Sequence, residues 1–176
     1  MPINIRSGGQ TGVDRAAIDA AVSCGLSYGG WCPRGGWAED FPESPGLLAK
    51  YPALTETPSR RPEQRTAWNV RDSHATLLIV RDNELDRSAG TKLTKRFAEL
   101  EFLRPWLLVN LKSGDTSERA PAWIAEVAAA VGSRDLWLNV AGPRESNAPG
   151  IYADAKAFLI SLLSSGSLRR GGTADH

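Results

Sequence analysis

The chain has 176 residues, with 21 lysines and arginines against 20 aspartates and glutamates, so its formal net charge is +1. This balance excludes bulk attraction to nucleic acid or to an anionic membrane, and any anion site must therefore be local. No apolar run approaches the roughly 20 residues of a membrane span, and the N-terminus lacks the apolar core of a signal peptide. We expect a cytoplasmic globular protein with no nucleic-acid or membrane partner.

The cysteines and histidines indicate neither a disulfide framework nor a metal site. Two cysteines, Cys24 and Cys32, are too few to form a framework of disulfide bonds. His74 and His176 form no metal-spaced cluster with them. Cys32 is more simply a small buried residue than a metal ligand. We therefore predict two free thiols and no metal held directly by side chains.

The first glycine-rich turn, Ser-Gly-Gly-Gln-Thr-Gly-Val-Asp-Arg at 7–15, lies between a short apolar run and an amphipathic run at 13–24. This pattern predicts a strand, a tight turn and a helix. The N–H groups of such a turn attract an anion, although the spacing fits neither the P-loop nor the dinucleotide fingerprint. The alternative is a plain connection. The candidate binding residues here are Gly8, Gly9, Gln10, Thr11, Gly12, Asp14 and Arg15.

A short second strand is predicted near 28–31, before an irregular stretch at 32–62 that is rich in proline and glycine. Loops of this length inside a compact domain are usually functional or mobile. Trp31 and Trp37 flank Arg34 within or beside this stretch. Either they form the wall of a pocket for a flat ligand, or they pack the loop onto the body of the protein.

A short helix is predicted at 63–72, with Arg65, Asn69 and Asp72 on one face. This face is either solvated or turned into a ligand cleft, and all three residues are candidates for binding. The apolar run at 75–80 then predicts a parallel strand that is covered on both sides.

A second strand–turn–helix unit follows, with its turn at 88–91 and its helix at 92–104. Thr91 is expected to cap the helix or to bind phosphate. The candidate binding residues are Ser88, Gly90, Thr91 and Thr94. The apolar stripe of the helix is expected to comprise Leu93, Phe97, Leu100 and Leu103.

The third unit contains a strand at 136–140, a turn at 141–146 and a helix at 150–163. Before it, a strand at 106–110 leads to a helix that we expect to open at Pro121. From 165 to 176 the composition predicts a disordered tail. The candidate binding residues of the third turn are Gly142, Arg144, Glu145 and Ser146.

Alternation of strands and helices predicts an α/β fold, with a doubly wound, mainly parallel sheet of about five or more strands and helices on both faces. We expect a single domain at 1–164. Because crossovers are right-handed, the turns at 7–12, 88–91 and 141–146 should meet at the carboxyl edge of the sheet. Ligands bind there in such folds.

Six blocks of the sequence resemble the family of molybdenum cofactor carrier proteins. They are Ser-Gly-Gly-Gln-Thr-Gly-Val-Asp-Arg-Ala-Ala (7–17), Gly-Gly-Trp-Cys-Pro-Arg-Gly with Ala-Glu-Asp (29–40), Tyr-Pro with Thr-Glu-Thr (51–57), Arg-Thr-x-x-Asn-Val-x-Asp-Ser (65–73), Gly-Thr-x-Leu-Thr (90–94) and Leu-Asn-Val-Ala-Gly-Pro-Arg-Glu-Ser (138–146). This family is similar to the SLOG superfamily in circularly permuted form. The resemblance implies a Rossmann-like fold and a homo-oligomer, either a dimer or a tetramer.

The resemblance also implies a function: binding of molybdenum cofactor, the phosphorylated molybdopterin, in order to protect or transfer it. Molybdate or another phosphate-like anion is a further candidate ligand. Molybdoenzymes or cofactor-biosynthesis proteins are the implied partners. Carried over by position, the contacts are Gly8, Gly9, Gln10, Thr11, Gly12, Ser88, Gly90, Thr91, Arg144, Glu145 and Ser146.

Two alternative functions are an N-glycosidic hydrolase acting on nucleoside monophosphates and a sensor of a nucleotide-like signal. SLOG hydrolases carry a Gly-Gly-x-Gly-Thr-x-x-Glu turn with a catalytic glutamate, and this chain has Thr94 in that place. Threonine does not stabilise an oxocarbenium-like centre as a carboxylate does, so we expect no catalytic residue unless Glu145 substitutes. We also expect Gly9→Val to block the first turn while leaving the fold largely intact.

Overall fold

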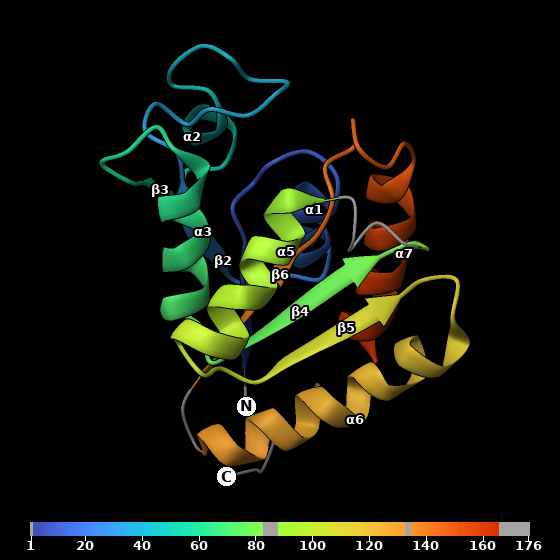
Figure 1. Ribbon diagram of the computed structural model, residues 1–176. Helices are drawn as coiled ribbons and strands as arrows, with labels where there is room; N and C mark the ends of the chain where they lie inside the picture. The colour runs from blue at the N-terminus through green and yellow to red at the C-terminus, as the bar shows by residue number, and fades with distance from the viewer. Residues whose placement is uncertain (1, 83–87, 133–134, 166–176) are drawn as a thin grey trace, which may run out of the picture.

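The computed structural model describes residues 2–82, 88–132 and 135–165 (Figure 1). Six strands in this part of the chain form a parallel sheet, which confirms the predicted Rossmann-like α/β fold. Their order across the sheet is β3 (Leu54–Glu56), β2 (Tyr28–Cys32), β1 (Ile3–Arg6), β6 (Leu136–Ala141), β4 (Ala75–Val80) and β5 (Trp106–Asn110). Beyond Ser165, the tail predicted for 165–176 lies outside the described residues.

Helices cover both faces of the sheet, as a doubly wound fold requires. On one face α1 (Val13–Ser23) packs against α7 (Ile151–Ser164), and α6 (Gly114–Val131) runs along β5. On the other face α3 (Pro62–Arg71) lies beside α5 (Ala89–Arg96), which Figure 1 shows in front of β4 and β6.

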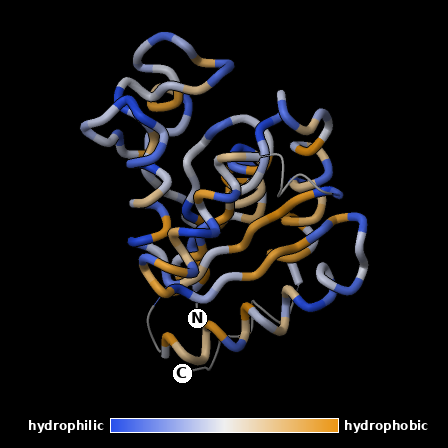
Figure 2. The backbone as a smooth tube through the Cα atoms, viewed as in Figure 1, coloured by the Kyte–Doolittle hydropathy of each residue, from blue (hydrophilic) through white to orange (hydrophobic). Residues whose placement is uncertain are grey.

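The two faces of the sheet differ in polarity. The face under α1, α6 and α7 is apolar, and alternate strand residues such as Ile5, Leu77 and Leu138 are fully buried in one large core. Figure 2 shows this apolar colouring along β4 and β5. The face under α3 and α5 buries polar groups instead. There the Asn139 amide lies 3.3 Å from the Thr76 hydroxyl, to which it donates.

The stretch at 32–62 is more regular than the sequence suggests, because it holds α2 (Leu47–Lys50) and the edge strand β3. A second apolar cluster anchors it, in which Leu47 and Leu54 pack with Ile18 of α1. Both elements have three or four residues, which is too short for a hydrophobic period to reveal them.

The predicted apolar stripe of the helix at 92–104 is wrong in its second half. After α5 the chain forms one π-helical turn, η1 (Phe97–Glu101), in which the Phe102 N–H donates to the Phe97 carbonyl. The extra residue in this turn shifts every later side chain around the axis. Leu100 is consequently 68% exposed while Ala98 is buried, and Leu103, which lies beyond the end of the helix with a φ of 48°, is 78% exposed.

Two helix starts also differ from the predictions. The helix predicted to open at Pro121 begins at Gly114, so Pro121 lies inside α6. It forgoes one hydrogen bond, to the Ser117 carbonyl, which an otherwise continuous helix can tolerate. The cap of α5 is Ser88 rather than Thr91, because the Ser88 hydroxyl accepts the Thr91 N–H at 3.3 Å.

Candidate functional site

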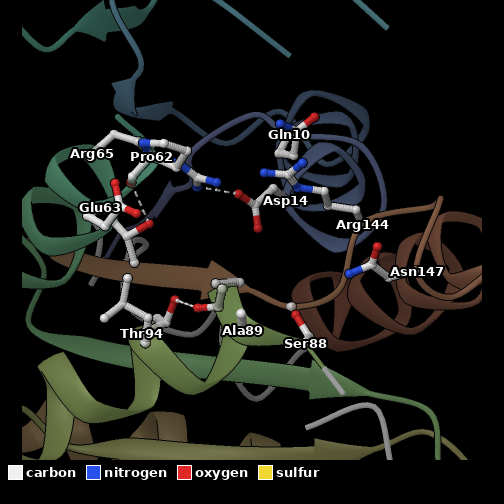
Figure 3. A pocket seen from close by; sticks show the side chains of 15 residues that line it. Gln10, Asp14, Pro62, Glu63, Arg65, Ser88, Ala89, Thr94, Arg144 and Asn147 are labelled. Carbon is white, nitrogen blue, oxygen red and sulfur yellow. Dashed lines mark hydrogen bonds and ion pairs between the residues drawn. The ribbon is translucent and has the colours of Figure 1, made fainter. Parts of the chain in front are cut away.

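A cavity of about 280 Å³ opens at the carboxyl edge of the sheet, where the turns after β1, β4 and β6 meet (Figure 3). These strands are neighbours in the order β1-β6-β4. The chain leaves β1 toward β2 and β3 on one side, whereas β4 lies on the other side of β6. The cavity thus lies where the winding direction reverses, the usual ligand position in such sheets.

Eight of the candidate binding residues line this cavity, and they come from all three turns and from α3. Their side chains or backbone atoms surround it from different sides, as Figure 3 shows for the labelled ones. They are Gln10, Asp14, Arg65, Ser88, Gly90, Thr94, Gly142 and Arg144.

Asp14 and Arg65 form a buried ion pair at the centre of one wall. The Arg65 Nη1 atom lies 2.9 Å from the Asp14 carboxylate, and their side chains are only 13% and 5% exposed. Burial raises the pKa of Asp14 above its ordinary value, against the opposing effect of the Arg65 charge. The guanidinium lies directly over Gly8, where any Cβ would overlap it. Gly8 therefore contributes space for this pair.

Arg144 forms no direct ion pair among the described residues, although its charge acts on the nearby carboxylates of Asp14 and Glu39. Its guanidinium instead stacks over the ring of Trp37, 5.6 Å from the centroid. Arg65 has a further free donor, because its buried Nε atom has no hydrogen-bond partner. An anion in the cavity would find both groups already desolvated in part.

The N-terminus of α5 forms the facing wall. The hydroxyl of Ser88 accepts a hydrogen bond from the Thr91 hydroxyl at 2.8 Å, and both side chains are buried. Thr94 donates back to the Gly90 carbonyl at 2.9 Å. A Cβ on Gly90 would meet no atom within 4 Å, so this position faces open space.

Glu39, from the loop after β2, binds the outer ends of the first and third turns together. Its carboxylate accepts hydrogen bonds from the Thr11 hydroxyl and, at 2.8 Å, from the Ser146 hydroxyl. Burial raises the pKa of Glu39, but these hydrogen bonds outweigh it, and the pKa lies below its ordinary value. The hydroxyl groups of Thr11 and Ser146 are therefore engaged by the Glu39 carboxylate beside the cavity.

Three further candidates occupy structural positions in the first and third turns. The Gly9 carbonyl accepts a hydrogen bond from Arg15 at 3.0 Å, and Gly12 caps α1. The carboxylate of Glu145 accepts the Tyr152 N–H at 3.0 Å and so binds the N-terminus of α7. It does not line the cavity.

The structure places Arg15, Asn69 and Asp72 away from the cavity. Arg15 forms two hydrogen bonds of 2.9 Å to Asp40. Asn69 binds the backbone N–H and carbonyl of Trp31 at 2.8 and 2.9 Å, and Asp72 accepts the Trp31 indole N–H at 2.7 Å. The Asn69–Asp72 side of α3 thus faces β2, whereas its N-terminal turn faces the cavity.

The cavity also includes residues that the sequence reasoning missed, chiefly Glu63, Thr66 and Asn147. Thr66 and Pro62 neighbour Arg65 around the first turn of α3, so they could have been found by extending its face toward the N-terminus. Asn147 follows the third turn directly. Glu63 is exposed at the cavity rim, and no motif identified it.

The described residues contain neither a metal-binding cluster nor a membrane-spanning helix. Both cysteines are free thiols, as predicted. In the ranges that the structure describes, no group of three His, Cys, Asp or Glu side chains could hold a metal ion. In those same ranges, no helix has the length and apolarity needed to cross a bilayer.

Comparison with known proteins agrees with the fold. The sequence model of the circularly permutated YpsA SLOG family matches residues 5–163. A crystal structure of a "putative molybdenum carrier protein" from Syntrophus aciditrophicus superposes with a TM-score of 0.76. The two sequences are 34% identical, and the match covers 93% of this chain and 96% of the chain in that crystal structure. No curated protein matches the chain significantly.

Proposed function

Because the chain belongs to the circularly permuted YpsA SLOG family, we propose that it binds molybdenum cofactor and holds it for protection or transfer. The observation that carries the proposal is the convergence of three glycine-containing turns on one cavity that is also lined by Arg144, which forms no direct ion pair among the described residues. The similar crystal structure is that of a "putative molybdenum carrier protein", which supports a ligand that contains molybdenum.

The residues present fit a phosphorylated heterocycle. Arg144 would hold the phosphate, together with Ser88 and Gly90 at the N-terminus of α5, where the helix dipole favours negative charge. The volume of about 280 Å³ lies near the lower end for small-molecule sites.

The polar groups around the cavity suit the flat part of such a ligand. Gln10 and Asn147 carry amides, and Asp14 carries a carboxylate, so donors and acceptors both face a ring that is rich in each. The bound cofactor would supply redox chemistry to an acceptor enzyme. The residues of this chain would bind, orient and shield it.

Gly90→Leu tests the site directly, because the new side chain would enter open space in the cavity without backbone strain. We expect wild-type protein to retain molybdenum cofactor saturably and Gly90→Leu to lose retention by at least about tenfold, since a filled cavity excludes the ligand. Retention is measured by equilibrium dialysis with detection of molybdenum.

Gly114→Leu is the matched control, since Gly114 opens α6 and also lies in open surroundings, outside the cavity. It should bind as the wild type does. Equal retention by the Gly90→Leu variant, with both variants folded by circular dichroism, would exclude this cavity as the cofactor site.

The hydrolase alternative is favoured by one observation: Asp14 and Glu63 both line the cavity, so two carboxylates are present there. Asp14, however, is committed to Arg65, and Thr94 and Glu145 are held by hydrogen bonds within the chain. Incubation with nucleoside monophosphates separates the two functions. Release of free base would support hydrolysis, while binding without turnover supports the carrier.

A homo-oligomer remains part of the proposal, with molybdoenzymes or cofactor-biosynthesis proteins as transfer partners. Light scattering of the purified protein tests the assembly. A dimer or tetramer is expected, and a monomer at all concentrations would contradict it.

A further inference from the structure

A second cavity, of about 480 Å³, lies beside the first and is larger than it. Pro62, the first residue of α3, lines both. The ring of Trp37 lines the second cavity, while the Arg144 guanidinium stacked on this ring lines the first. The two cavities are therefore adjacent, and one extended ligand can reach both.

The second cavity has its own charge. Arg34 and Arg60 line it and are exposed, and neither guanidinium forms an ion pair among the residues that the structure describes. Glu43 is the one acidic residue in its lining, so the lining carries a net positive charge. Guanidinium groups bind phosphate in a bidentate fashion.

The second cavity also has an aromatic surface in the ring of Trp37, which is half-buried. Aromatic rings provide stacking platforms for nucleobases, and this contact tolerates every base because each has a π-face. An aromatic ring beside two unpaired arginines thus matches a nucleotide: the ring suits the base, and the arginines suit phosphate.

We propose that the second cavity is a nucleotide subsite, so that the ligand of this protein is a phosphorylated heterocycle joined through a pyrophosphate to a nucleoside. This inference rests on the proposed function, because the heterocycle occupies the first cavity. The phosphates lie between the two cavities, within reach of Arg144 on one side and Arg60 on the other. The base lies against Trp37.

The experiment compares two probes: molybdopterin cofactor without a nucleotide, and the same cofactor carrying GMP through a pyrophosphate. We expect wild-type protein to bind the nucleotide-linked form at least about tenfold more tightly, because that form gains both a stacked base and phosphate contacts to the arginines of the second cavity. Equal dissociation constants for the two forms would overturn the subsite.

Arg60→Ala and Arg34→Ala locate the effect, because both residues are exposed and neither lines the first cavity. Each should remove most of the advantage of the nucleotide-linked form and leave binding of the nucleotide-free form within about twofold. Arg61→Ala is the control, since Arg61 is an exposed arginine that lines neither cavity. An equal effect of Arg60→Ala and Arg61→Ala would reject the proposal.

The two proposals fail in different ways. Saturable binding of the nucleotide-free form, without any preference for the linked form, keeps the carrier function and removes the subsite. Absence of binding for both forms overturns both proposals, because the subsite depends on a ligand in the first cavity.

Discussion

Arg65 is the residue on which the cavity wall depends most. It neutralises the buried carboxylate of Asp14, lies over the backbone of Gly8 and keeps one donor without a partner. A buried carboxylate without a counter-charge is strongly destabilising, because the interior solvates the charge poorly. The same residue therefore links the stability of the fold to the electrostatics of the site.

Arg65→Met should lower the free energy of unfolding by about 3–5 kcal/mol at neutral pH, the usual cost of removing one partner of a buried pair. The pKa of Asp14 is already raised by burial, and loss of Arg65 raises it further. A carboxyl group whose pKa is raised in the folded state stabilises that state at a pH below its ordinary pKa. This stabilisation is lost as the pH rises. Urea unfolding between pH 4.5 and 7.5 should therefore show that the free energy of unfolding of Arg65→Met falls further below that of the wild type as the pH rises.

Arg61→Met provides the comparison, because Arg61 is an exposed arginine at the N-cap of the same helix. It should change stability by less than about 0.5 kcal/mol at either pH. If the loss in Arg65→Met were the same at every pH, packing of the side chain and not the charge of Asp14 would account for it.

The candidate site was predictable where the chemistry of a residue and its place in a turn coincide. Gln10, Ser88 and Arg144 follow strand ends and line the cavity. Asn69 and Asp72 show the limit, because both hold Trp31 and their helical spacing alone did not distinguish this contact from a ligand contact. The expectation that Gly9→Val leaves the fold largely intact also fails, because Gly9 has a φ of 71°, where a β-branched side chain is strained.

At the scale of elements, the segment from α5 through η1 is the least regular part of the helical layers. It rests on the polar face of the sheet and turns Thr91, Thr94 and Ala98 inward. Periodicity predicted the opposite orientation after Phe97, because a π-turn leaves no signature in the spacing of apolar residues. β3 was missed because three residues are too few to show a hydrophobic period, and the early start of α6 was missed because a proline typically opens a helix, which favoured a start at Pro121.

A pair of substitutions tests this orientation. Leu100→Lys should change the free energy of unfolding by less than about 0.5 kcal/mol, because the side chain is already in solvent. Ala98→Leu should destabilise by about 1–3 kcal/mol, since it adds volume to a closed interior. Thermal unfolding followed by circular dichroism measures both. The reverse ranking would show that the helix continues without the π-turn.

At the scale of the whole molecule, the alternation of strands and helices was enough to predict a parallel sheet and a ligand edge. The strand order β3-β2-β1-β6-β4-β5 could not be predicted, because no local sequence pattern indicates which strands become neighbours in the sheet. That order brings the turns after β1, β6 and β4 together. The polar α3–α5 face and the loop with Glu39 then complete the surroundings of the cavity.

The most direct measurement is the anomalous X-ray signal of molybdenum in crystals of the protein grown with molybdenum cofactor. The molybdenum peak should lie in the cavity bounded by Gln10, Gly90 and Arg144. A peak elsewhere on the protein, or no peak at saturating cofactor, would contradict the assignment of this edge of the sheet as the binding site.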